Sequence, residues 1–186
     1  MLTNEELREL GDIAREVADE ALNEVYGYGL SVDPGSFGYI ANQYSSSFVL
    51  NAALNGCEDL ENLAAFAHQG WAQAHYDHPQ EGASQEKLDA RTKLADTPYF
   101  NLSETEKEKD RVVAKAVYAC TPRASQMYLW ADPSSEAGTC YTIATRFELL
   151  MSYNWDVSKV DDLLVTSFAS QLTEEQAKTL LAALAV

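Results

Sequence analysis

The chain has 186 residues and a net charge of −16, from 29 acidic and 13 basic side chains. Its length is typical of one domain with one substantial core, and its negative charge repels nucleic-acid phosphates, which argues against direct binding of DNA or RNA. No stretch approaches the roughly 20 apolar residues that span a bilayer. The acidic start, MLTNEELREL, lacks the basic and apolar parts of a signal peptide. We therefore expect a soluble, cytoplasmic protein (in the host cytoplasm if phage-encoded) that does not contact membranes.

The first predicted helix begins at a capping box, Thr3-x-x-Glu6, in which a hydroxyl and a carboxylate satisfy two free amide groups. Apolar residues then recur at helical spacing as far as Val25, and Gly27 ends the pattern. The opposite face is acidic, which is typical of a solvated surface. Its residues are Glu5, Glu9, Asp12, Glu16, Asp19 and Glu20.

The middle of the chain predicts three further helices and a long loop. A turn at residues 33–36 precedes a helix over 37–54, and a third helix covers 58–75. Residues 77–96 are polar and contain proline and glycine, so they are interpreted as a loop with at most one short turn at 85–94. Ser103-x-x-Glu106 is a second capping box, and it opens a helix that extends to about Ala119.

The last third of the chain has weaker signals. Residues 123–130 are ambiguous, 132–135 form a turn, and 140–151 are interpreted as a helix although they contain β-branched residues. Two closing helices are predicted to start near Ser158 and Thr173. No long alternating run indicates a sheet. The whole pattern predicts a mainly α protein, a single compact domain of six to eight helices.

The three histidines, His68, His75 and His78, raise the question of a metal site. Two turns of helix separate His68 from His75, about 10 Å, which is too far for both to bind one ion. The three cysteines show no C-x-x-C spacing, so they predict neither a zinc site nor a disulfide framework. No nucleophile elbow, P-loop or zinc-protease pattern is present. We expect a non-enzymatic protein without a metal ion or another cofactor.

The acidic charge is unevenly spread. Residues 1–64 carry 12 acidic against 2 basic side chains, whereas residues 65–124 carry 9 against 8. The nearly neutral centre is where an anionic ligand could approach. The acidic start supports another hypothesis, in which the protein imitates nucleic acid and occupies a basic groove on a protein partner.

The central stretch, 94–117, combines a proline-tyrosine turn with a capped, charged helix. Lys107, Arg111 and Lys115 are four residues apart and share one helix face, with acidic residues between them. One interpretation is a helix laced with salt bridges. The other places Trp71 and Tyr99 as aromatic walls beside Arg111, in a cleft for a purine or another flat anion.

Two sequence blocks in this region resemble the RyR domain, the repeat of ryanodine receptors that also occurs in stand-alone bacterial and phage proteins. The first block is His68-Gln69-Gly70-Trp71-Ala72. The second is Pro98-Tyr99-Phe100-Asn101-Leu102, which runs directly into Ser103-Glu104-Thr105-Glu106-Lys107-Glu108-Lys109-Asp110-Arg111. Between the blocks, His75-Tyr76-Asp77-His78-Pro79 replaces the Gly-Trp-x-Tyr-Gly segment usual in the family.

The resemblance implies a helical RyR-like module over residues 58–122, between an acidic helical segment at 1–57 and a C-terminal segment at 123–186. It also implies a small nucleotide-like ligand, for sensing or sequestering a signal. The ligand-binding residues carried over by the resemblance are His68, Trp71, Tyr99, Lys107, Asp110 and Arg111.

Our leading hypothesis is thus a non-enzymatic RyR-domain protein of bacterial or phage type that binds a nucleotide-like ligand. The alternative is an acidic protein-binding inhibitor or a structural component of a virion. Apolar residues beyond the needs of one small core, in 37–48 and in the closing helix, also favour a homo-oligomer.

Overall fold

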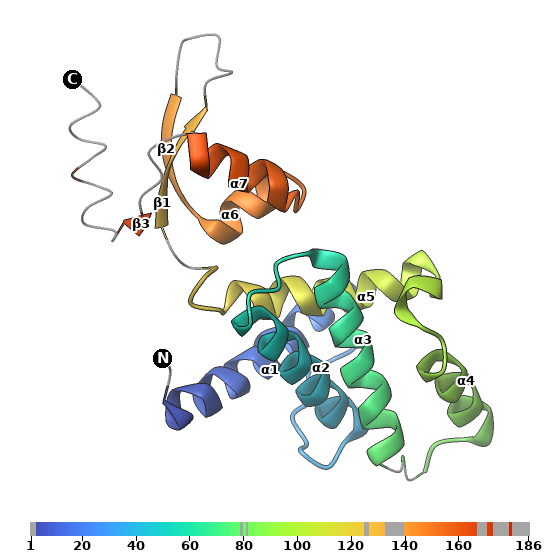
Figure 1. Ribbon diagram of the computed structural model, residues 1–186. Helices are drawn as coiled ribbons and strands as arrows, with labels where there is room; N and C mark the ends of the chain where they lie inside the picture. The colour runs from blue at the N-terminus through green and yellow to red at the C-terminus, as the bar shows by residue number, and fades with distance from the viewer. Residues whose placement is uncertain are drawn as a thin grey trace. The chain divides into compact units, whose positions relative to one another are not determined.

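The structure is a computed structural model that describes residues 3–78, 80, 82–124, 127–132, 140–166, 171–172 and 179. Its contacts divide the chain into two compact units, Met1–Thr121 and Pro122–Val186. This division falls where the sequence predicts the central module to end. Seven α-helices lie within the described residues (Figure 1), so the prediction of a mainly α protein with six to eight helices is confirmed.

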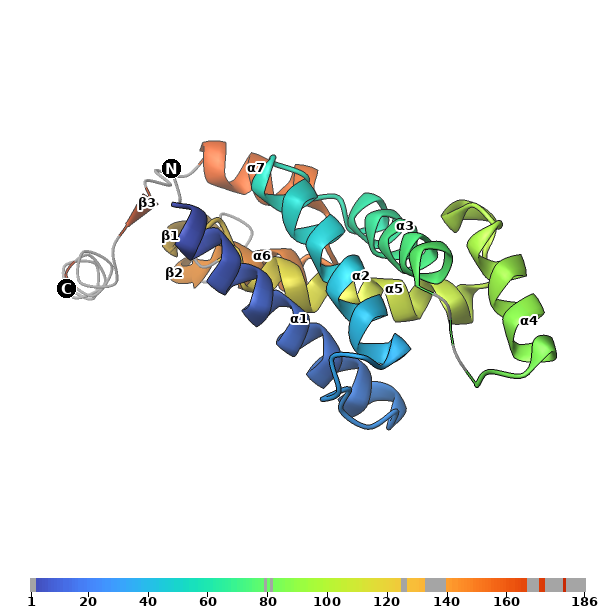
Figure 2. The same ribbon diagram turned by 90° about the horizontal axis from the view of Figure 1, so that it is seen from below.

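The first unit contains five α-helices and one 3-10 helix. In chain order they are α1 (Asn4–Tyr26), α2 (Phe37–Leu54), α3 (Leu60–Asp77), α4 (Gln85–Ala95), η1 (Tyr99–Asn101) and α5 (Glu104–Ala119). Helices α1, α2, α3 and α5 pack on one another, and α4 packs against α3 (Figure 2). The core between them consists largely of alanine, with Val49, Leu63 and Val117 as fully buried larger side chains. Small core residues let the helix axes approach closely.

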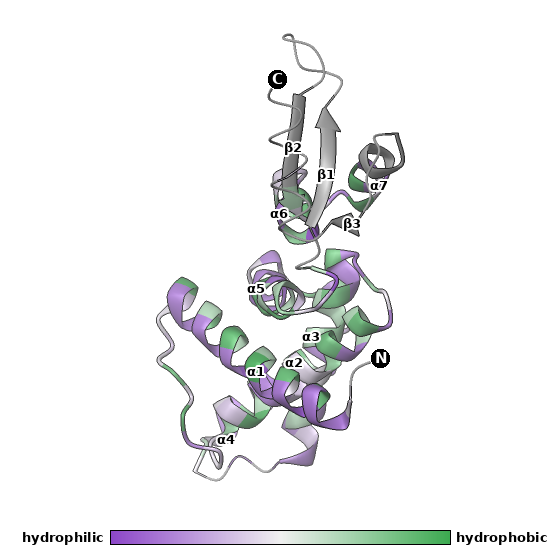
Figure 3. Cartoon of the chain, turned by 90° about the vertical axis from the view of Figure 1, so that its left-hand side faces the viewer, coloured by the Kyte–Doolittle hydropathy of each residue, from purple (hydrophilic) through white to green (hydrophobic). Residues whose placement is uncertain are grey.

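Helix α1 begins and ends as its sequence predicts. Thr3 and Glu6 form both halves of the capping box, and Gly27 ends the helix in the left-handed conformation, with φ of 66°. Hydrophobic and hydrophilic residues alternate along α1 (Figure 3). Asp19 was wrongly predicted to be solvated, because it is only 6% exposed. Its carboxylate accepts hydrogen bonds from the Ser31 backbone amide and the Asn42 side chain, each at 2.7 Å, and so ties the following loop and α2 to α1.

Helices α2 and α3 come into very close contact at Gly70. A Cβ atom at this position would lie 2.6 Å from the Tyr44 carbonyl oxygen and 2.7 Å from the Ser45 Cα. Those neighbours are backbone atoms and cannot move aside. Glycine is therefore required here by packing, and the contact places Ser45 beside the α3 residues next to Gly70.

Helix α4 corrects the prediction of a long loop over residues 77–96. Ser84 caps it by accepting from the Lys87 amide, and its sequence, QEKLDARTKLA, consists almost entirely of good helix formers. None of its residues is fully buried, so it lacks the apolar stripe on which the sequence interpretation depended. Propensity and one capping residue determine this helix.

Helix α5 starts as predicted, but only half of its capping box forms. Ser103 accepts from the Glu106 amide, whereas both carboxylate oxygens of Glu106 bind the Lys109 ammonium at 2.9 Å. The Glu106 side chain, which was expected to accept from the Ser103 backbone amide, pairs with Lys109 on the next turn of the helix instead.

The second unit contains a small antiparallel sheet and two helices. Strands β1 (Met127–Asp132), β2 (Cys140–Thr145) and β3 (Gln171–Leu172) have the order β2-β1-β3, and Met127 pairs with Thr145. Helices α6 (Arg146–Ser152) and α7 (Val157–Thr166) follow β2. The helix predicted over 140–151 is therefore wrong in its first half, where the β-branched residues adopt the extended conformation that suits them.

Helix α6 is opened by a capping box that the sequence analysis missed, formed by Thr145 and Glu148. Helix α7 lies where a closing helix is predicted. The predicted turn at 132–135 and the predicted last helix from Thr173 fall largely outside the described residues. Among the helices that the structure describes, none has the length and apolar character needed to cross a membrane.

Candidate functional site

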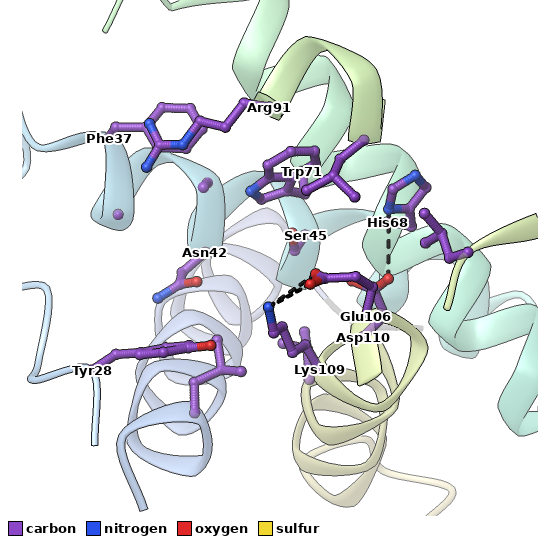
Figure 4. Close-up of a pocket in the computed structure, with 16 residues that line it drawn as sticks. Tyr28, Phe37, Asn42, Ser45, His68, Trp71, Arg91, Glu106, Lys109 and Asp110 are labelled. Atoms are coloured by element: carbon purple, nitrogen blue, oxygen red, sulfur yellow. Dashed lines mark hydrogen bonds and ion pairs between the residues drawn. The ribbon is translucent and has the colours of Figure 1, made fainter. Parts of the chain in front are cut away.

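A cavity of about 380 Å³ opens between the helices of the first unit (Figure 4). We call it the helical cavity and define it by the ten residues labelled in that figure. They are Tyr28 from the loop after α1, Phe37, Asn42 and Ser45 from α2, His68 and Trp71 from α3, Arg91 from α4, and Glu106, Lys109 and Asp110 from α5. Its volume lies within the range of about 300–1,000 Å³ that is usual for small-molecule sites.

Helix periodicity explains why these residues share one cavity. His68 and Trp71 are three residues apart on α3, and Lys109 and Asp110 follow Glu106 by three and four residues on α5, so each set lies toward one side of its helix. The α2–α3 contact at Gly70 then places Ser45 against the α3 set.

His68 and Asp110 form a buried pair at the side of the cavity. The Nδ1 atom of His68 lies 3.5 Å from an Asp110 carboxylate oxygen, and its Nε2 donates a hydrogen bond of 3.0 Å to the Thr97 carbonyl. A carbonyl only accepts, so Nε2 carries a hydrogen and Nδ1 faces the carboxyl group. When a further proton lies between the two side chains, on either the ring or the carboxyl, the pair has no net charge.

The pKa values of both groups in this pair are shifted upward. Burial alone lowers the pKa of His68, but the hydrogen bond and charge of Asp110, with the carbonyls of Thr97 and Leu94, outweigh burial and raise it. Burial raises the pKa of the Asp110 carboxyl, and His68 only partly offsets that effect. The folded protein therefore holds the shared proton more firmly than the separate side chains would.

Lys109 and Glu106 form the second pair. Both oxygens of the carboxylate lie 2.9 Å from the Lys109 ammonium. Partial burial lowers the pKa of Lys109, but Glu106 and then Tyr28 outweigh burial, and the pKa is raised. The lysine charge is thus neutralised inside the cavity.

Arg91 differs from these two pairs. Its guanidinium lies over the Phe37 ring, 4.5 Å from the ring centroid, and no carboxylate among the described residues forms an ion pair with it. Burial lowers the pKa of Arg91, although arginine stays protonated under all ordinary conditions. The sequence analysis did not select Arg91, because it lay in a stretch interpreted as a loop.

Polar groups without a partner face the interior of the cavity. Ser45 is only 5% exposed, yet its hydroxyl forms no hydrogen bond with any described residue. The Trp71 indole N–H, too, has no acceptor within the described part of the chain, and its nitrogen lies on the side of the ring facing Asn42 and Ser45 (Figure 4). Asn42 donates its amide hydrogens to Asp19, which leaves its oxygen available as an acceptor. The cavity can therefore offer two donors and one acceptor to a ligand.

The opposite face of α5 forms a closed ion-pair network. Arg111 binds both oxygens of Glu61, at 2.6 and 3.0 Å, and also contacts Glu104 at 3.0 Å and Glu108 at 3.2 Å. The Tyr99 hydroxyl donates to Glu61 at 3.0 Å. These contacts raise the pKa of Arg111 and lower that of Glu61, for which the hydrogen bond from Arg111 is the main cause.

The structure separates the six predicted ligand-binding residues into two groups. His68, Trp71 and Asp110 line the helical cavity. Tyr99 and Arg111 belong to the ion-pair network, and Lys107 pairs with Glu104 at 3.2 Å. For Arg111 the structure shows the salt-bridged arrangement, and Trp71 lies in the cavity rather than beside this arginine.

The other two histidines have separate partners. His75 accepts from the Gln80 amide at 2.7 Å and donates to the Thr92 hydroxyl at 2.9 Å, while His78 lies 3.0 Å from the Tyr44 hydroxyl. Burial, followed by the charge of Arg91, lowers the pKa of His75. Among the described residues, no three His, Cys, Asp or Glu side chains gather as a group that could hold a metal ion.

No protein family, no curated protein and no solved structure matches this chain. The RyR resemblance therefore depends on the two sequence blocks alone, and what the cavity can bind must be argued from its own residues.

Proposed function

We propose that this protein binds a small nucleotide-like ligand in the helical cavity and catalyses no reaction on it. The observation that carries the proposal is the convergence of the two sequence blocks on one cavity: His68 and Trp71 come from the first block and Asp110 from the second. These are the blocks that resemble the RyR domain, for which a nucleotide-like ligand is implied.

The chemistry of the cavity supports this class of ligand. The indole of Trp71 offers a flat apolar surface on which a base can stack. The free Trp71 N–H, the Ser45 hydroxyl and the Asn42 oxygen can bond to polar atoms at the edge of a base or to a sugar hydroxyl. A few polar groups within an otherwise apolar lining are typical of small-molecule sites.

Isothermal titration calorimetry against a panel of adenine and cyclic nucleotides tests the proposal. We expect measurable binding, weakened at least about fivefold by Trp71→Leu because a stacking surface worth about 1–3 kcal/mol is lost. Phe66→Leu is the matched control, since Phe66 is also on α3 but is 38% exposed and lies outside the cavity lining. The proposal fails if no nucleotide binds below about millimolar concentration, which corresponds to about −4 kcal/mol.

A further inference from the structure

The charges that line the helical cavity leave one positive charge without a partner. The His68–Asp110 pair is neutral while a proton is shared between the ring and the carboxyl group. Glu106 neutralises Lys109 through both carboxylate oxygens. Arg91 lies over the Phe37 ring and lacks a carboxylate partner among the described residues. With that proton bound, the lining has a net charge of about +1 in a protein of net charge −16, and in either protonation state Arg91 is the cation without a carboxylate partner among the described residues.

This isolated charge lies next to an aromatic surface, and the unpaired hydrogen-bonding groups lie elsewhere in the cavity. The guanidinium lies over the Phe37 ring, and because no carboxylate among the described residues pairs with it, its N–H groups can bind an anion. Ser45 lines the interior of the cavity and is more than nine-tenths buried. Its hydroxyl has no hydrogen-bond partner in the described part of the chain. Figure 4 shows Arg91 and Ser45 on opposite sides of Trp71.

We infer that the helical cavity selects a planar aromatic monoanion, and that Arg91 is the residue that binds its anionic group. The ring of the ligand lies against Trp71, and its polar edge reaches Ser45 and Asn42. For a nucleotide this means a single phosphodiester, as in a cyclic monophosphate. The inference rests on the proposed function because it takes the same cavity as the ligand site. It adds the charge of the ligand and the residue that binds the charged group.

Ligands with several charges do not fit this lining. A second phosphate would need another cation, and the ammonium of Lys109 is already held by Glu106. It would also approach the carboxyl groups of Glu106 and Asp110, which line the same space, and like charges in a partly desolvated site repel strongly. A neutral nucleoside would leave Arg91 without an anion, so it would gain only the stacking and hydrogen bonds.

The experiment is a calorimetric titration of the full chain with four probes: a nucleoside, its cyclic monophosphate, its triphosphate, and naphthoate as an aromatic monoanion that is not a nucleotide. The variants are Arg91→Gln and the control Lys93→Gln, which removes an exposed cation from the same helix. We expect the cyclic monophosphate to bind at least about tenfold more tightly than the nucleoside or the triphosphate, because a charge-assisted hydrogen bond contributes about that much.

The variants then assign that preference to a residue. Arg91→Gln should remove the preference for the cyclic monophosphate over the nucleoside, while nucleoside binding and the Lys93→Gln titrations stay unchanged. The inference is overturned, with the proposed function intact, if the triphosphate binds most tightly or if Arg91→Gln leaves the preference in place. If naphthoate binds in an Arg91-dependent way and no nucleotide binds, the proposed function fails and the inference stands. If no probe binds, both fail.

Discussion

The two faces of α5 contain similar charged residues but differ in whether the groups on the neighbouring helices that face them have polar partners. On the network face, Arg111 has hydrogen bonds to three carboxylates and Tyr99 donates to one of them. On the cavity face, Lys109 is neutralised by Glu106, yet Arg91 and Ser45 across the cavity have no polar partner among the described residues. On the network face the arginine already has its carboxylate partners, whereas the arginine across the cavity has none among the described residues.

This difference shows that one charged helix can stabilise the fold through ion pairs on one face and line a ligand cavity with the other. An arginine held by two oxygens of one carboxylate is already in its preferred arrangement, so a ligand phosphate would have to displace Glu61 to reach it. A cation that stacks on a ring and lacks a carboxylate can bind an anion without breaking any ion pair. Arg91 is therefore better placed than Arg111 to bind an anionic ligand.

The largest effect should come from breaking the helix contact on which the cavity face depends. Gly70→Ala places a Cβ against the α2 backbone at 2.6–2.8 Å, and such overpacking costs about 1–3 kcal/mol. Gly11→Ala on α1 is the control, because its Cβ would meet nothing within 4 Å and alanine gains up to about 1 kcal/mol in a helix. Urea denaturation should show the two variants moving in opposite directions. Equal stabilities would mean that the α2–α3 contact is not tight.

A smaller effect should distinguish the two arginines. Arg111→Met leaves three carboxylates close together without their cation, and we expect the free energy of unfolding to fall by about 2 kcal/mol, reduced by the partial exposure of those carboxylates. Arg91→Gln loses only its contact with the Phe37 ring, worth less than about 1 kcal/mol. Thermal unfolding of both variants measures the contrast. A larger loss for Arg91→Gln would reverse the assignment of the two faces.

The smallest effect concerns the proton in the His68–Asp110 pair. Both groups have a raised pKa in the folded protein, so the folded state holds a proton that the unfolded chain releases above the ordinary histidine pKa of about 6.5. Stability from this pair is therefore present below about pH 6.5 and is lost as the pH rises through the higher folded-state value. We therefore expect the free energy of unfolding to fall between pH 6.5 and 8.

Asp110→Asn provides the comparison for that measurement, because the amide preserves the shape of the side chain but cannot share the proton. The variant should lose the slope between pH 6.5 and 8. His75 does not contribute to the slope in this pH range, because its pKa is lowered and it titrates at lower pH. The same slope in both proteins would show that the pair does not hold the proton.

The sequence predicted the parts of the fold that depend on neighbours along the chain. Helices α1, α2, α3 and α5 lie where they were predicted. The signals that predict them are local: the capping pair Thr3 and Glu6, the turn before Phe37, the cap Ser103, and the apolar spacing within each helix. Helix α4 and strand β2 were missed for one reason: each lacks a clear period. In α4 no residue is fully buried, and β2 becomes a strand because it pairs with β1.

Which residues face a cavity depended on tertiary structure alone. The sequence placed His68, Trp71 and Asp110 in one motif with Arg111, but it could not show that Glu61, 50 residues away, captures this arginine. Nor could it show that Arg91 lacks such a partner or that Gly70 brings Ser45 to Trp71. Local patterns fix the helices, because capping and periodicity act over a few residues. Whether a charge is satisfied or left for a ligand depends on groups distant in sequence, and only packing brings those together.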